Sequence, residues 1–426
     1  MNYYIQSLFI AIPLFVILII IEIIISKIKG ININEHADMI SSLSSGITNT
    51  IKDVFKVGIV IISYAWLVDE ITIFKLEPLW LAVLLAFIVQ DFSGYWMHRL
   101  SHRVNIFWNR HVIHHSSEEF NLSCALRQSI SEVFKFSAIL MFPAALFGIP
   151  ANIFIILAPI HLFMQFWYHT RLINKMGILE YIIVTPSHHR VHHAINPEYL
   201  DKNYSQIFII WDKLFNTFQE ELDNVKPVYG TLRPVLTWNP IIINFKHIWQ
   251  IAKDSWYTFR LVDKVKIWFM PTGWRPNDVK QKFPLKEINN DSYSQIKYKT
   301  KNSSLILAWS WIQHIIAGLM MFHLFTVMNI GKPLLSDYLY GVFIFIHIFS
   351  FTAILDCSKH SIIAEFFKIT LGVFLLYSQR NIWFNFSEIF FVGVILYFIL
   401  SFILTIKFYL EQKSFLNSGP NYFKGS

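Results

Sequence analysis

Charged residues are scarce in this sequence, and their scarcity decides its class. Only 15% of the 426 residues are Asp, Glu, Lys or Arg, whereas 54% are hydrophobic. A soluble domain carries about a quarter charged residues, so the composition excludes that class. Apolar runs of about 20 residues are long enough to cross a bilayer as helices. The sequence therefore predicts an all-α, polytopic integral membrane protein whose first partner is the lipid bilayer.

Cysteine pairs and glycine-rich loops are also missing. Neither Cys124 nor Cys357 has a second cysteine two or three residues away, which argues against both a disulfide framework and a cysteine metal site. The chain has no Walker-type or Gly-x-Gly-x-x-Gly loop, so nucleotide-driven transport and Rossmann cofactors are not favoured. The net charge of +8 is spread along loops, as membrane topology and anionic headgroups require, and we expect no nucleic acid partner.

Hydrophobic segments fall into two groups, separated by a long polar middle. The first group is expected at about residues 8–25, 54–67, 79–96, 134–147 and 151–167, and the second at 304–327, 340–355, 362–377 and 386–410. The leader MNYYIQSL has no positive charge and no small-residue cleavage site follows, so the first segment is expected to be a span. The fourth and fifth are short enough to form a hairpin that does not fully cross.

Lysines set the expected orientation of these spans. Lys27, Lys29, Lys52 and Lys56 flank the loop after the first span and predict a cytosolic location for it. The acidic stretch VDEITIFKLE is then expected outside. This places all the histidine-rich motifs on the cytosolic side, at the inner membrane in a bacterium or the endoplasmic reticulum in a eukaryote.

Histidines are abundant in three short motifs. HRLSH, HVIHH and HHRVHH form an H-x3-H, H-x2-HH, H-x2-HH pattern, and on a helix residues three or four apart share one face. Eight imidazoles are enough to hold two transition-metal ions, although imidazole alone does not select the metal. The predicted ligands are His98, His102, His111, His114, His115, His189, His192 and His193. His169 is a plausible ninth ligand, and His188 is either a ligand or a residue that orients one.

Polar residues near these motifs are candidates for orienting the imidazoles. They are Asp91, Glu118, Asn121, Asp201, Asn203 and Asp212. Asp212 stands in the otherwise apolar stretch IIWDKLFNTF, so it needs a buried partner, and a ligand histidine would serve. The isolated histidines elsewhere in the chain are expected to bind no metal.

The motifs resemble those of the fatty acid hydroxylase and sterol desaturase superfamily. The stretches DMISSLSSGITNTIKD, HHSSEEFNLSCALRQS, TPSHHRVHHAINPEYLDKNY and IIWDKLFNTF resemble its ether-lipid-cleaving branch, the alkylglycerol monooxygenases, over roughly residues 36–275. The resemblance implies a non-haem di-iron centre held by the eight histidines, with His188 matching an extra histidine of the branch. That branch often has Glu where this chain has Arg103, and the difference concerns substrate and reductant more than the metal.

The resemblance implies a lipid-modifying oxygenase. It would hydroxylate the ether-linked carbon of a glyceryl ether with O2, giving a fatty aldehyde and glycerol or a derivative, with tetrahydrobiopterin or another external donor supplying electrons. We expect a hydroxylase domain at 1–275, a polar linker at 276–302 and a four-helix membrane unit of unknown role at 303–426. Another lipid or sterol hydroxylase or desaturase is the main alternative. A metal transporter is less favoured, because the clustered histidines lie at the ends of spans rather than inside them.

Overall fold

The structure is a computed structural model, and it describes residues 3–132, 134–135, 137–285, 291–328, 332–380, 383 and 388–418. These residues are mostly helical, which confirms the predicted fold class. The exception is a pair of two-residue strands, β1 (Ile59–Val60) and β2 (Phe134–Lys135), which pair in parallel.

Six helices in the described part of the chain are long and apolar enough to cross a membrane. Even α15, with 19 residues, is about 28 Å long at 1.5 Å per residue, which matches the hydrocarbon core of a bilayer. The chain is therefore a multi-pass membrane protein. The six are α1 (Tyr3–Ile28), α4 (Leu79–Arg103), α13 (Ser304–Val327), α14 (Leu335–Leu355), α15 (His360–Ser378) and α16 (Glu388–Ser418).

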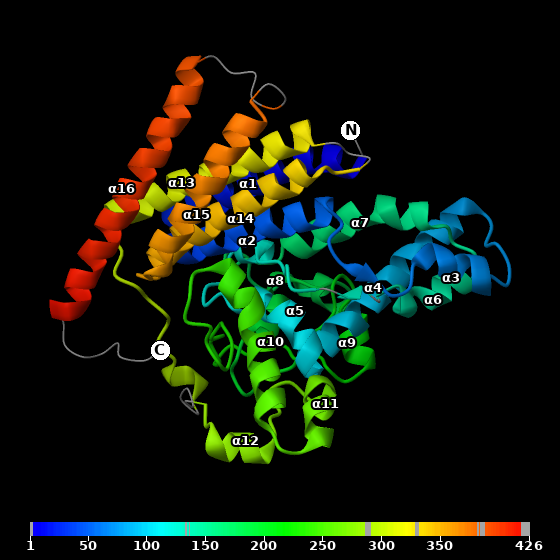
Figure 1. Cartoon of the computed structure of the whole chain (residues 1–426). Helices are drawn as coiled ribbons and strands as arrows, with labels where there is room; N and C mark the ends of the chain where they lie inside the picture. The colour runs from blue at the N-terminus through cyan, green and yellow to red at the C-terminus, as the bar shows by residue number, and fades with distance from the viewer. Residues whose placement is uncertain are drawn as a thin grey trace.

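The predicted span at residues 54–67 is wrong, and residues 134–147, which were expected to be short enough for a hairpin that does not fully cross, also hold no candidate span among the described residues. Residues 54–67 hold β1 and the start of α3 (Tyr64–Ile71), and residues 134–147 hold β2, the 3₁₀ helix η2 (Ser137–Met141) and α6 (Phe142–Leu146). Lys56 and Gly58 have positive φ angles, so no helix passes through them. The short elements satisfy their backbone by pairing with each other beside α7 (Ala151–Phe166), as the right-hand side of Figure 1 shows.

A polar helix, α2 (His36–Val54), lies in the bundle where sequence analysis expected no span. It packs against α13 and α14 (Figure 1). Ser44 Oγ lies 3.1 Å from His314 Nδ1, and the ring of Phe55, just after α2, stacks on Tyr338 at 4.7 Å. Neighbouring helices shield its serines from lipid, so its hydropathy carries no membrane signal.

The largest hydrophobic cluster contains residues from both ends of the chain. Ile40 and Ile51 of α2 are packed with Phe325 of α13 and Phe351 of α14, all at most 1% exposed.

A buried carboxylate in α1, Glu22, accepts hydrogen bonds from Thr170 Oγ1 at 2.6 Å and the Leu122 amide at 2.8 Å. These hydrogen bonds fix α1 to the loops that follow α5 and α7, which adjoin the histidine motifs.

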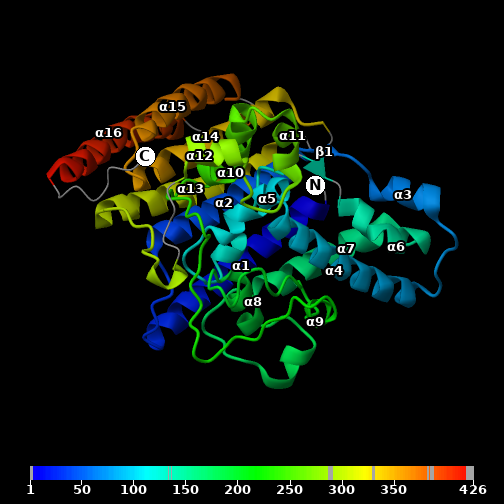
Figure 2. The same cartoon turned by 90° about the horizontal axis from the view of Figure 1, so that it is seen from below.

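The polar middle of the chain forms a layer of short helices below the spans in Figure 1, seen from below in Figure 2. Its elements are α5 (Asn105–His115), η1 (Cys124–Leu126), η3 (Gly177–Tyr181), α8 (Pro186–His193), α9 (Ile210–Leu214), α10 (Pro240–Tyr257), α11 (Leu261–Phe269), α12 (Asn277–Lys282) and η4 (Ser292–Ser294).

Part of the predicted linker contacts this layer. The Tyr298 amide donates to Glu118 Oε2 at 2.5 Å, and Lys297 Nζ lies 2.5 Å from Glu119 Oε1. Lys297 and Tyr298 are therefore held against the chain that follows α5, while 286–290 lie outside the described residues. The division into three domains stays a prediction.

Candidate metal centre

Four segments bring the predicted ligands together. The last turns of α4 carry His98 and His102, α5 carries the second motif, α8 carries the third, and His169 follows α7. Helix α8 begins at this point for local reasons. Thr185 caps its first turn by accepting from the amide of residue 188, and Pro186 takes the first helical position, where no amide hydrogen is needed.

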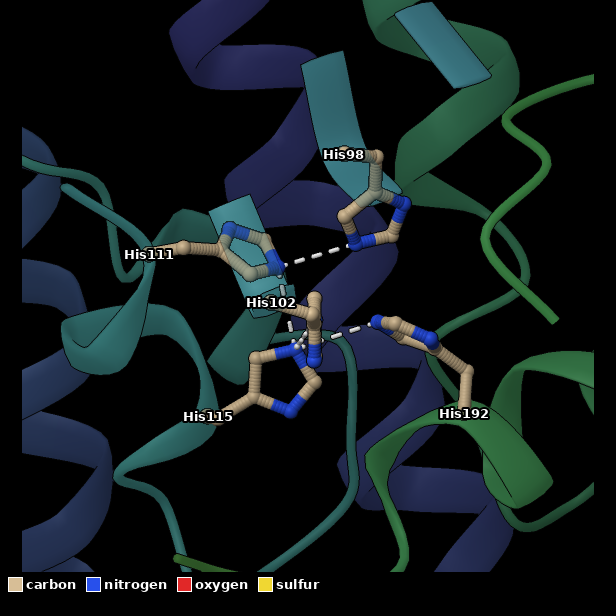
Figure 3. Close-up of side chains that lie close together, drawn as sticks. All are labelled: His98, His102, His111, His115 and His192. Atoms are coloured by element: carbon tan, nitrogen blue, oxygen red, sulfur yellow. Dashed lines mark hydrogen bonds between the residues drawn. The ribbon is translucent and has the colours of Figure 1, made fainter. Parts of the chain in front are cut away.

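The nine imidazoles form two separate groups. Within each group, one ring nitrogen from every residue lies within 4.8 Å of all the others. Figure 3 shows the rings of the first group converging from three sides. The first group is His98, His102, His111, His115 and His192, and the second is His114, His169, His189 and His193.

The ring nitrogens of the first group have more close neighbours than hydrogen bonds can satisfy, because the single Nε2 atom of His115 approaches three other Nε2 atoms at 3.0–3.1 Å. His98 Nδ1 lies 2.6 Å from the Tyr204 carbonyl oxygen, and His192 Nδ1 lies 3.0 Å from that of Lys202. A carbonyl oxygen only accepts, so both Nδ1 atoms carry the hydrogen and both Nε2 atoms present lone pairs. Those Nε2 atoms nonetheless approach His111 Nε2 at 2.9 Å and His115 Nε2 at 3.1 Å.

A cation at the centre of each group would satisfy these lone pairs. Metal–imidazole bonds are about 2.1 Å long, so two ligands at right angles have nitrogens about 3.0 Å apart. In the first group His102 and His111 lie 3.1 and 3.0 Å from His115, measured between Nε2 atoms. In the second group the corresponding distances are 3.2, 2.9 and 3.1 Å. The nine residues therefore fit two metal ions.

Burial keeps these imidazoles neutral. It lowers the pKa of His114 to about 3, and it holds the pKa of His115, His189 and His193 well below the usual value of 6.5, with neighbouring histidines adding to the effect. Neutral imidazole is the form that binds metal, so the donor set is ready at neutral pH without losing protons.

Two of the predicted orienting carboxylates act through the backbone. Asp212 accepts from the amides of Tyr204 and Ser205, both at 2.8 Å, and from Thr217 Oγ1 at 2.7 Å. The interpretation that a ligand histidine is its partner is therefore wrong. Burial raises the pKa of the Asp212 carboxyl, and the three donors counteract that shift. Asp91 likewise accepts from the amides of residues 207 and 208 and from the indole of residue 211.

Two of the predicted orienting residues lie in the loop after α8. Asp201 and Asn203 both have positive φ angles, a conformation that Asp and Asn adopt more readily than most residues. Asn203 donates to the carbonyls of His188 and Gln219. Asp201 Oδ1 lies 3.8 Å from His102 Nδ1.

The remaining candidates lie further from the rings. Glu118 holds the described part of the linker, and Asn121 donates to the Ile33 carbonyl at 2.8 Å. His188 belongs to neither group: its Nδ1 accepts from the Thr185 amide at 3.4 Å, and its Nε2 lies 3.8 Å from Glu180 Oε2. Its assignment as a ligand or orienting residue stays a prediction, as do the metal-binding roles of the nine.

The backbone carbonyls that fix the orientations of two imidazole rings were not predicted from the sequence. The carbonyl oxygens of Lys202 and Tyr204 hold His192 and His98, and a backbone carbonyl has no signature in a sequence. Two aromatic side chains that pack beside the rings, Tyr204 and Phe120, were also not predicted from the sequence. Tyr204 packs 5.2 Å from His102 and Phe120 packs 5.2 Å from His193, measured between ring centroids.

A helical membrane protein with two buried polyhistidine groups has the architecture expected of a membrane-bound metalloenzyme. Comparisons with known proteins agree. Residues 83–217 match the fatty acid hydroxylase family model. Alkylglycerol monooxygenase from Homo sapiens is 38% identical over 309 residues, which cover 71% of this chain and 67% of that protein.

Other relatives extend the comparison. Alkylglycerol monooxygenase from Xenopus tropicalis is 36% identical over 324 residues, 75% of this chain and 71% of that protein. The ornithine lipid hydroxylase OlsE from Rhizobium tropici is 30% identical over 142 residues, 33% of this chain and 43% of that protein. No solved structure matches the chain. The chain belongs to the fatty acid hydroxylase family as a homologue of the alkylglycerol monooxygenases, and it is an oxidoreductase.

Proposed function

We propose that this protein is a di-iron monooxygenase that hydroxylates the ether-linked carbon of an alkylglycerol lipid. The products are a fatty aldehyde and glycerol or a glycerol derivative. The proposal depends on the two histidine groups, which contain five and four residues. The relatives of the chain that are named alkylglycerol monooxygenases support the choice of substrate.

Iron would be held by His98, His102, His111, His115 and His192 at one position and by His114, His169, His189 and His193 at the other. Bound there, two iron ions supply the O2 chemistry needed to attack an unactivated C–H bond.

The chain's own residues hold the imidazoles in place and keep water out. The carbonyls of Tyr204 and Lys202 fix one tautomer each at His98 and His192. Seven of the nine ligands are at most 9% exposed, and the rings of Phe120 and Tyr168 pack directly on His169. Such a buried, preorganised set of ligands holds the metal positions fixed relative to one another.

Arg103, which stands where the alkylglycerol monooxygenases often have Glu, forms an ion pair with a nearby carboxylate. Arg103 Nη1 lies 2.8 Å from Asp201 Oδ2, and Asp201 Oδ1 faces His102. A carboxylate therefore stands beside the ligand, although it comes from a different position in the chain. We propose that this carboxylate orients His102, and that electrons come from tetrahydrobiopterin or another external donor.

We place the two groups on the cytosolic side. Lys27 and Lys29 at the end of α1 predict a cytosolic location for that end, and Lys29 Nζ lies 3.5 Å from the carbonyl oxygen of Leu172, three residues after His169. Hydroxylation of another lipid is the second candidate, and the likeness to an ornithine lipid hydroxylase supports it.

Turnover of a 1-O-alkylglycerol tests the proposal. Detergent-purified protein, supplied with O2 and tetrahydrobiopterin, should release fatty aldehyde, and the His192→Ala variant should release none above background. The matched control is His360→Ala, which removes an exposed histidine that belongs to neither group. Aldehyde release by the His192→Ala variant at the wild-type rate would contradict the proposal. No aldehyde from alkylglycerols, with oxidation of an ornithine lipid instead, would favour the second candidate.

A further inference from the structure

A cavity of about 660 Å³ lies among α13, α14, α15 and α16, separate from the histidine groups. All four helices are candidate spans, so the cavity lies at membrane depth. Its wall is mainly aliphatic and aromatic, with Leu319, Phe343, Leu376, Val394 and Phe398 among the lining residues. The volume falls within the range of about 300–1,000 Å³ that is typical of small-ligand sites.

The cavity opens to the outer surface of the helix bundle. Three of its lining residues are strongly exposed: Leu319 is 64% exposed, Phe390 47% and Ile389 84%. Gly393 also lines it, and a Cβ atom built on this glycine meets nothing within 4 Å. The surface around the opening is apolar, so the medium that reaches it in a membrane is lipid rather than water.

The cavity wall is polar but uncharged where His347 and Tyr397 line it, and the buried side chain of Gln313 lies behind these two residues. His347 Nε2 donates to the Gln313 carbonyl at 2.9 Å, and Tyr397 OH donates to Gln313 Oε1 at 2.7 Å. Gln313 is 2% exposed, and its Nε2 amide has no hydrogen-bond partner among the residues that the structure describes. These groups lie near the middle of their helices, and the residues that line the cavity include no Asp, Glu, Lys or Arg.

A buried ion pair holds the helices around the cavity in a fixed arrangement. In α15, Lys368 Nζ lies 2.5 Å from Glu365 Oε1, and both side chains are at most 2% exposed. Ser350 of α14 and Ser401 of α16 donate to the two oxygens of Glu365 at 2.6 and 2.5 Å. Charged groups are costly at this depth and are retained when they are fully paired. The pair fixes α15 to both neighbours, so the cavity is part of a defined structure.

We propose that this cavity binds one neutral, single-chain lipid: an alkyl chain ending in an uncharged oxygen group such as a hydroxyl, ether or aldehyde. The chain fits the apolar wall, and the oxygen group lies at the polar part of the wall formed by His347 and Tyr397, behind which the Gln313 Nε2 amide is buried. A phosphate or ammonium headgroup would be stranded at mid-membrane without a counter-charge, so phospholipids are excluded. Binding itself is independent of the histidine groups. That the lipid is an alkylglycerol substrate or its aldehyde product rests on the proposed function.

Photolabelling tests the site. The full-length protein in nanodiscs is irradiated with a diazirine-tagged 1-O-alkylglycerol, and the labelled peptides are mapped by mass spectrometry. Label should fall within α13–α16, and 1-O-hexadecylglycerol should displace it, whereas phosphatidylglycerol should not. Gly393→Trp fills the cavity and should reduce labelling about tenfold. The control is Gly318→Trp, because Gly318 also has open space beside it but does not line the cavity.

Label confined to residues 83–217, equal displacement by phosphatidylglycerol, or equal labelling of the two tryptophan variants would overturn the proposal. The metal content of the Gly393→Trp variant shows whether it has folded. If it has not folded, the labelled positions in the wild-type protein and the displacement of that label by 1-O-hexadecylglycerol test the proposal. If α13–α16 are labelled but no aldehyde forms, the lipid site stands and the proposed function is rejected. If aldehyde forms but these helices carry no label, the proposed function stands and the lipid site is rejected.

Discussion

The carboxylate of Asp212 offers a quantitative test of how the metal ligands are positioned. Its oxygens accept three hydrogen bonds at 2.7–2.8 Å, and its side chain is fully buried. One donor is the amide of Tyr204, whose carbonyl in turn holds His98 at 2.6 Å. Removing Asp212 therefore loosens the loop that orients this ring.

The expected loss of stability follows from the donors left behind. Each buried donor without a partner costs about 1–3 kcal/mol, and three donors are affected. Asp212→Ala should therefore lower the free energy of unfolding by about 3–5 kcal/mol, since partial entry of water offsets the upper end of the range. Metal content should fall as well, because outer partners of metal ligands typically contribute about 10–100-fold to affinity.

Thermal unfolding in detergent and metal analysis measure both effects. The matched control is Asp223→Ala, because the Asp223 side chain is 97% exposed and its contact with Lys175 is on the surface. If Asp212→Ala melts and binds metal like Asp223→Ala, the loop does not position the ligands and the reasoning is refuted.

Three further predictions concern the ligands and their surroundings. His115→Ala and His193→Ala, which lie in different groups, should each remove about one metal ion per chain while leaving the other group loaded; equal loss of both ions from either variant would contradict two separate sites. The chelator-treated protein should lose stability as the pH falls below 6.5. Burial lowers the pKa of His188 to about 4, so between these pH values the unfolded chain binds a proton at His188 and the folded chain does not. An unfolding midpoint that stays constant from pH 7.5 to 5 would refute this. Arg103→Ala should change stability by less than about 1 kcal/mol with metal content retained, because the Arg103 side chain is 59% exposed; strong metal loss in this variant would give the residue a direct role at the centre.

The sequence predicted the grouping of the histidines better than it predicted the membrane topology. Histidine spacing on short helices is a local property, so all nine predicted ligands lie in the two groups, and only the division between the groups needed the fold. Helix α2 was missed as a member of the bundle because its serines are shielded by α13 and α14, and shielding by distant segments leaves no trace in hydropathy. Residues 54–67 have the opposite problem: they are apolar enough to suggest a span, but the positive φ angles at Lys56 and Gly58 prevent a continuous helix.

The orientation of the rings could not be predicted at all. It depends on the carbonyls of Lys202 and Tyr204, and on the carboxylate of Asp212 that holds their loop. Acidic residues near a histidine motif suggest direct partners, yet here most of them act on the backbone. The difference arises because the loop after α8 adopts positive φ angles at Asp201 and Asn203, which sets its path past the rings.

Metal stoichiometry tests the central claim most directly. Elemental analysis of the purified, folded wild-type protein should find iron at about two ions per chain, since two separate histidine groups fit one ion each. Folded protein that binds no iron after reconstitution, or that binds only one ion at saturation, would contradict the account of a di-iron oxygenase.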